Sequence, residues 1–154
     1  MERYATFLTL LLFAGCTEGP GIVTNPGDSA VLEDETCPII SHEPVTAAQP
    51  IGQAVSIQAT VTDNIDGDTE DDEDESGVFQ TKVYFKMETT TVWDSSNLTL
   101  MDASGIYGGS IPGSAVTGGG MNYYIYAVDM KRNECTLPVG GEGDPWHFRV
   151  NPDE

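Results

Sequence analysis

The sequence predicts an all-β domain, built as a single antiparallel sandwich of about seven strands. The first observation is that several short runs alternate apolar and polar residues, which is the period of a half-buried strand. The second is that clusters of Gly and Pro separate these runs. The third is that no stretch sustains the 3.6-residue apolar period of a helix. The runs lie within Cys37–Asn151, a length that suits one domain.

The first half of the domain contains three predicted strands. Pro38–Val45 is placed at a sheet edge, because Pro44 cannot donate a hydrogen bond to a neighbouring strand. Gln53–Thr62 has the cleanest alternation, with apolar residues at every second position. Val78–Met87 follows the same pattern. Each of the last two strands is therefore expected to bury one face and expose the other.

The second half contains the remaining predicted strands. Met121–Met130 is the strongest of them, because apolar or aromatic residues occupy every second position along one face. Trp146–Val150 closes the domain, with three apolar residues that alternate with His147 and Arg149. The shorter runs are Thr89–Trp93, Leu98–Met101 and Gly105–Ile111.

Several of these runs resemble the strands of immunoglobulin-like or fibronectin type III-like modules of bacterial extracellular proteins. The resemblance covers roughly residues 38–151 and is carried by Pro44–Asp63, Val83–Lys86, Tyr107–Pro112, Tyr123–Asp129 and Pro145–Val150. It implies an immunoglobulin-like sandwich in which Tyr123 is the corner tyrosine near the start of the penultimate strand. It implies no particular activity, because such sandwiches host many unrelated functions. The chain departs from the family in its Cys37/Cys135 pair and in an acidic insertion, residues 63–75.

Residues 1–15 have the features of a signal peptide. The apolar segment from Phe7 to Ala14 is too short for a transmembrane helix, which needs ~20 apolar residues. The run Leu12–Cys16 resembles the lipobox of bacterial lipoproteins, and this implies cleavage before Cys16, acylation of its thiol and attachment to a membrane. An ordinary cleaved signal with an incidental cysteine is the alternative. Thr17 replaces the Asp that commonly retains such lipoproteins at the inner membrane, which implies the outer membrane of the cell envelope.

The remaining cysteines are Cys37 and Cys135, and in an oxidising compartment they are expected to form a disulfide. Residues 16–36 are rich in Gly, Pro and acids, so we interpret them as a flexible tether, and 152–154 as a tail.

The net charge of −19 argues against nucleic acid and anionic lipid as partners, since both would be repelled. It favours solubility, cation binding or a basic partner.

The acidic insertion, residues 63–75, has nine acidic residues among thirteen. Alignment on Gly67 gives a partial calcium-loop pattern, whose candidate ligands are Asn64, Asp66, Asp68, Glu70 and Glu73. Thr62 occupies the first position, where that pattern requires a carboxylate. The favoured interpretation is therefore a solvated, self-repelling loop, with calcium as the alternative cofactor.

No pattern of an enzyme nucleophile, zinc protease or phosphate loop occurs in the sequence. His42 beside the first strand and His147 on the last one are expected to be structural. Tyr84, Tyr124 and Tyr126 are expected either to form a strip that binds sugar or peptide, or to pack as cross-strand pairs. The sequence thus predicts a lipid-anchored, non-enzymatic binding or structural module with a protein or glycan partner. The alternative is a calcium-dependent adhesion or carbohydrate-binding module.

Overall fold

The computed structural model describes residues 34–63 and 77–151. Its strands are β1 (Ile39–Ser41), β2 (Gln49–Pro50), β3 (Val55–Thr62), β4 (Val78–Met87), β5 (Asp94–Leu100), β6 (Ile106–Ile111), β7 (Gly119–Asp129), β8 (Glu134–Leu137) and β9 (Trp146–Asn151). Two short 3-10 helices, η1 (Gly113–Ala115) and η2 (Gly141–Gly143), lie between them. The described part is therefore all-β, as predicted. Within it, no helix has the length and apolar character needed to span a membrane.

Several predicted segments lie outside the described residues. They are the signal peptide 1–15, Cys16, the tether up to residue 33, insertion residues 64–75 and the tail 152–154. Of the insertion, only Asp63 is described, directly after β3.

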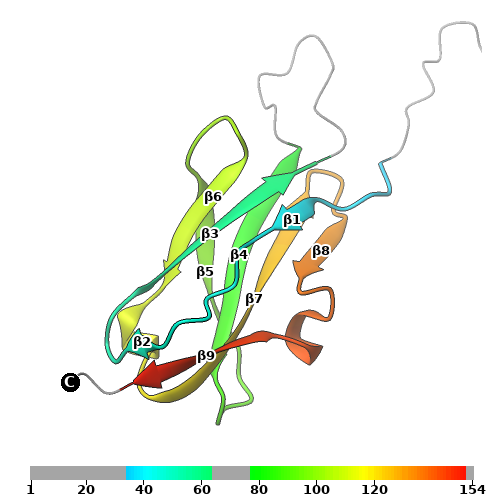
Figure 1. Cartoon of the computed structure of the whole chain (residues 1–154). Helices are drawn as coiled ribbons and strands as arrows, with labels where there is room; N and C mark the ends of the chain where they lie inside the picture. The colour runs from blue at the N-terminus through cyan, green and yellow to red at the C-terminus, as the bar shows by residue number, and fades with distance from the viewer. Residues whose placement is uncertain (1–33, 64–76, 152–154) are drawn as a thin grey trace, which may run out of the picture. The chain divides into compact units, whose positions relative to one another are not determined.

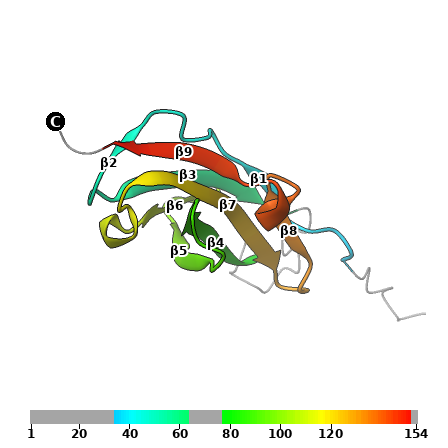
Figure 2. The same cartoon turned by 90° about the horizontal axis from the view of Figure 1, so that it is seen from below.

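The strands follow the order β1-β3-β6-β5-β4-β7-β9-β2, with β8 on β7 as well. Strand β5 joins two parts of the sheet, because it pairs with β4 through Asp94–Leu98 and with β6 through Thr99 and Leu100. Figures 1 and 2 show the sheet curled around its interior. One pair, β2 with β9, is parallel, so the sheet is mixed and the purely antiparallel arrangement predicted from the sequence is corrected at this edge.

The core lies inside the curled sheet and comes mainly from alternate residues of β3, β4 and β7. Strand β3 buries every second side chain and exposes the others along its whole length, as its sequence pattern predicts. Ile57, Ile125 and Met121 are among the side chains without solvent exposure. The other faces of β4 and β7 carry half-buried polar and aromatic residues, which makes them an outer surface.

The structure corrects the strand predictions in several places. Thr89–Trp93 forms no strand, and a turn precedes most of it, in which the backbone N–H of Thr90 donates to the carbonyl of Met87 at 3.1 Å. Pro38–Val45 forms a strand only at β1. Strands β2 and β8 were not predicted, because they are two and four residues long and too short to show an alternating pattern.

The predicted disulfide is confirmed. Cys37 lies two residues before β1, and its Cα is 5.6 Å from that of Cys135. Cys135 lies within β8. The bridge joins residues 98 positions apart and fixes the segment before β1 to a strand paired with β7.

Candidate functional site

Tyr123 and His42 form a hydrogen-bonded network inside the domain. The hydroxyl of Tyr123 accepts a hydrogen bond from the backbone N–H of Val45 at 2.8 Å and lies 3.0 Å from Nε2 of His42. Nδ1 of His42 lies 2.6 Å from the carbonyl oxygen of Gln58. Because a carbonyl only accepts, Nδ1 carries the proton and Nε2 accepts from the Tyr123 hydroxyl.

The surroundings keep both rings of this network uncharged at neutral pH. Burial lowers the pKa of His42, although the hydrogen bond to Gln58 opposes this shift. Burial also raises the pKa of Tyr123 to about 12. Trp146 packs against both rings, with centroids 4.9 Å from His42 and 5.3 Å from Tyr123. Every polar atom of the two rings thus has a partner, an arrangement that suits a structural role.

His147 lies elsewhere, on the exposed side of β9. Its side chain is 42% exposed, and its Nε2 lies 3.7 Å from a carboxylate oxygen of Glu88. The two histidines therefore do not form one site. Neither has a Ser, Thr or Cys side chain among its hydrogen-bond or ion-pair partners in the described residues.

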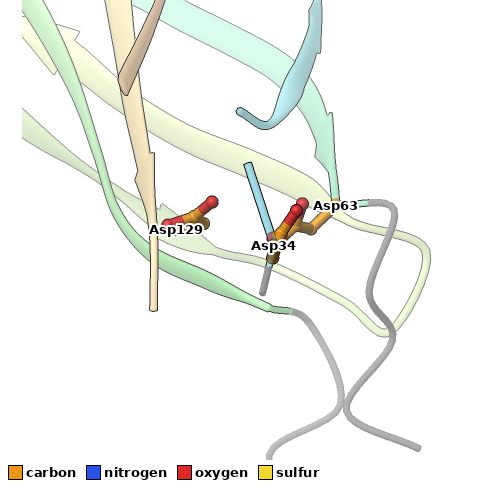
Figure 3. Close-up of side chains that lie close together, drawn as sticks. All are labelled: Asp34, Asp63 and Asp129. Carbon is orange, nitrogen blue, oxygen red and sulfur yellow. The ribbon is translucent and has the colours of Figure 1, made fainter. Parts of the chain in front are cut away.

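Three aspartates meet at one end of the sheet (Figure 3). Asp34 precedes β1, Asp63 follows β3 and Asp129 ends β7. One carboxylate oxygen from each lies within 4.8 Å of the others. Figure 3 shows the carboxylates of Asp34 and Asp63 side by side, with that of Asp129 turned toward them. Asp129 is 0% exposed and Asp34 9% exposed, so this acidic cluster (Asp34, Asp63 and Asp129) is largely shielded from water.

Hydrogen bonds hold two members of the acidic cluster in place. The carboxylate of Asp129 accepts from the backbone N–H and from the side-chain amide of Asn133, both at 2.8 Å. The same amide donates to the backbone carbonyl of Asp34 at 2.9 Å. The carboxylate of Asp34 accepts from the backbone N–H and the hydroxyl of Thr36, at 3.0 Å and 2.7 Å.

The acidic cluster has the donor chemistry of a calcium site. Calcium takes six to eight oxygen ligands at about 2.3–2.6 Å, so two oxygens on one ion lie at most about 5 Å apart. The 4.8 Å limit among the three carboxylates satisfies this condition. Without a cation or a shared proton, three carboxylates at this separation would repel one another.

Sequence reasoning missed Asp34 and Asp129 as members of a cluster. Strands β3 and β7 run in the same direction, because an even number of antiparallel pairings separates them. Their C-terminal ends, and hence Asp63 and Asp129, therefore reach the same edge of the sheet. The signal available in the sequence was an aspartate at the C-terminal end of each of these two strands, Asp63 after β3 and Asp129 at the end of β7. The predicted ligands Asn64, Asp66, Asp68, Glu70 and Glu73 lie outside the described residues.

A second site lies on the outer face of β4 and β7, where aromatic rings gather. Tyr84 and Tyr124 are cross-strand partners, and their rings stack with centroids 5.0 Å apart and planes 8° from parallel. Tyr126 stands nearly perpendicular to Tyr84, and Trp93 nearly perpendicular to Tyr124. The Nζ atom of Lys86 lies 4.8 Å from the ring centre of Trp93. The tyrosines thus form the predicted cross-strand pair.

Beside these tyrosines is a hollow of about 610 Å³, which we call the tyrosine hollow. Tyr84, Tyr124 and Tyr126 line it, together with residues of the neighbouring strand β8 and of η2, including Glu134 and Glu142. Burial, together with a hydrogen bond to Glu134, raises the pKa of Tyr126 to about 12. Burial also raises the pKa of Tyr124, with smaller effects from Tyr84 and Glu142. These phenols are therefore neutral at physiological pH.

Comparisons with known proteins identify no family. No protein-family model matches the chain, and no curated protein matches it. Among solved structures, an endo-beta-1,4-mannanase from Thermotoga petrophila aligns with 79% of this chain at 13% identity, with a TM-score of 0.48. The chain spans 21% of the length of that mannanase. A likeness at this level assigns neither a family nor an activity to the chain.

Proposed function

We propose that the protein is a lipid-anchored protein of the bacterial cell envelope, whose single immunoglobulin-like domain is a non-enzymatic binding or structural module. The lipid is attached to Cys16, at the end of the apolar N-terminal run, and it anchors the protein in the outer membrane. The sandwich assignment is supported by two sheet regions that share β5 and enclose one core. It is also supported by Tyr123, whose hydroxyl binds the backbone of Val45 as a corner tyrosine would.

The observation that carries the binding role is the tyrosine hollow. Soluble domains rarely expose large contiguous apolar patches, and solvent-accessible aromatic residues beside polar groups are typical of contact surfaces. The histidines support the non-enzymatic part of the proposal, because His42 is held in a part-buried hydrogen-bonded network and His147 pairs with Glu88 on the surface. A protein or glycan partner fits such a surface, whereas the net charge of −19 disfavours nucleic acid.

The anchor is tested by Cys16→Ser in the native host. The variant is expected to leave the membrane fraction, because several acyl chains hold a protein firmly and none would remain. A variant that stays in the detergent phase like the wild type would show that Cys16 is not the anchor.

The binding role is tested by a pull-down from native envelopes with the purified full chain. A module with a partner should retain one envelope component repeatedly, and Tyr124→Ala should release it. A chain that retains nothing specific in this assay would leave only the structural role. Melting curves of the wild type and Tyr124→Ala control for misfolding.

A calcium-dependent adhesion module is the second candidate function, and the acidic cluster favours it. Two of its three carboxylates are buried, and Asp63 leads directly into the insertion with the partial calcium-loop pattern. An ion held by Asp34, Asp63 and Asp129 would fasten the segment before β1 to the ends of β3 and β7. Such an ion would order this end of the domain without entering a reaction.

Calorimetric titration of the full chain with calcium tests this candidate. We expect a one-to-one isotherm with a dissociation constant of ~10⁻⁴–10⁻³ M, as for extracellular calcium modules. Asp63→Asn should abolish it, while the exposed control Asp144→Asn should not. Asp66→Ala distinguishes the two possible sets of calcium ligands: it should weaken binding only if the loop pattern in the insertion supplies ligands. An absence of heat, with an unchanged melting temperature in millimolar calcium, would rule the candidate out.

A further inference from the structure

Two kinds of residue line the tyrosine hollow. The aromatic ones come from β4 and β7. The acidic ones are Glu134 at the start of β8 and Glu142 in η2, both exposed to solvent. No Lys or Arg is among the described residues that line the hollow. A ligand inside it would therefore meet both aromatic rings and carboxylates.

Both kinds of residue attract positive charge. Aromatic faces attract Lys and Arg side chains through the ring quadrupole, and carboxylates pair with the same groups. The aromatic face already shows this preference, because the ammonium of Lys86 lies over Trp93. Lys82 is the cross-strand partner of Tyr126, but neither Lys82 nor Lys86 is among the residues that line the hollow. The net charge of −19 would also draw a cationic partner toward the domain.

The arrangement of the rings disfavours a sugar as the ligand. Tyr84 and Tyr124 stack on each other, so each ring gives one of its faces to the other. Tyr126 and Trp93 stand almost perpendicular to this pair, at 84° and 74°. The rings therefore do not form the flat platform on which a pyranose ring would lie. We therefore take the charge of the ligand as the main feature that the tyrosine hollow would recognise.

We propose that the tyrosine hollow binds a Lys or Arg side chain presented by a peptide segment of a partner protein. This inference rests on the proposed binding function and specifies the class of partner. The cationic group would contact the tyrosine rings and the carboxylates of Glu134 and Glu142, all of which line the hollow.

The test is fluorescence anisotropy of the purified full chain with a labelled Gly-Arg-Gly-Arg-Gly peptide. Saturable binding is expected, and raising the salt from about 50 to about 300 mM should weaken it, because salt screens exposed charges. The double variant Glu134→Gln/Glu142→Gln should weaken binding about tenfold, since it removes both carboxylate charges while keeping the side-chain shape. The matched control Glu43→Gln/Glu88→Gln changes the net charge equally at exposed sites outside the hollow and should bind like the wild type.

Three results would overturn the inference. The first is an Arg peptide that binds no better than a Gly-Gln-Gly-Gln-Gly peptide. The second is equal weakening by the hollow and control variants, which would indicate general charge attraction. The third is binding of a neutral oligosaccharide such as chitotetraose that Tyr124→Ala abolishes and the double Gln variant leaves intact, because this would assign the hollow to a glycan. If the envelope pull-down still retains its component with the double Gln variant, the proposed binding function stands and only this inference fails.

Discussion

The hydroxyl of Tyr123 binds two neighbours at once: it accepts from the backbone of Val45 and donates to Nε2 of His42, 3.0 Å away. Tyr123 is 0% exposed, so neither bond competes directly with solvent at that oxygen. This single atom thus connects the segment between β1 and β2 to the central strand β7.

Tyr123→Phe is expected to lower the free energy of unfolding by ~1–3 kcal/mol, because it leaves two part-buried polar groups without that partner. Urea unfolding followed by fluorescence measures the change. Tyr84→Phe is the matched control: its ring lies on the half-exposed outer face, and its loss should stay within about 0.5 kcal/mol. Equal effects in the two variants would contradict a special role for the Tyr123 hydroxyl.

The pH dependence of stability should reveal His42. Burial lowers its pKa in the folded state below the ordinary 6.5. Above that pH the ring is neutral in both states, so the network contributes fully. As the pH falls below 6.5, the unfolded chain takes up a proton that the folded chain resists, and the free energy of unfolding decreases.

This decrease is measured by denaturant unfolding between about pH 7 and about pH 5.5, where histidine is the main titrating side chain. His42→Gln should flatten the slope relative to the wild type. His147→Gln, which replaces a 42% exposed ring, is the control. A slope that persists in His42→Gln and disappears in His147→Gln would contradict this prediction, because it would assign the effect to His147.

The Cys37–Cys135 bridge should contribute substantially to stability. It links residues 98 positions apart, and chain-entropy arguments give ~2–5 kcal/mol for a loop of that size. Thermal unfolding of the Cys37→Ser/Cys135→Ser variant measures the loss. Wild type under reducing conditions should show a similar loss, while reductant should leave the double variant unchanged. An unreduced wild type whose thiols both react after denaturation would contradict the bridge.

Asn133 is expected to stabilise the turn that carries Asp129. Its backbone and side chain donate to the carboxylate of Asp129, and its side chain also donates to the carbonyl of Asp34. Asn133→Ala should cost ~1–3 kcal/mol, because part-buried acceptors lose their donor. Asn97→Ala, at an exposed position of β5, serves as the control. Comparison of the two melting temperatures decides, and equal shifts would rule out the proposed role of the Asn133 side chain.

The sequence predicts the long strands well and the short ones poorly. Strand β4 has the predicted bounds, and β3 and β7 differ from prediction by one or two residues, because alternation over eight or more residues leaves little ambiguity. Strand β8 has four residues, and β2 has two and joins the edge in parallel. The pairing of these short strands depends on how the rest of the fold positions them, and the local alternation of apolar and polar residues carries no information about that.

The candidate sites divide in the same way. The pairing of Cys37 with Cys135 followed from counting cysteines, and the facing tyrosines followed from the alternation of β4 and β7. The acidic cluster did not, because it depends on two strands ending at the same edge and on a segment before β1. The acidic residues of the tyrosine hollow were also missed, since Glu134 lies in the unpredicted strand β8.

The position of the disulfide has a mechanical consequence. Strand β1 pairs with β3 through only three residues, so tension applied to its N-terminal end would break these pairs one after another. Cys37 lies ahead of β1, and the covalent bridge transmits part of such a pull to β8, which is paired with the central strand β7. The load is thereby shared between two strand pairs that must yield together. A pull on the chain preceding Cys37 would therefore not act on the short β1–β3 pairing alone.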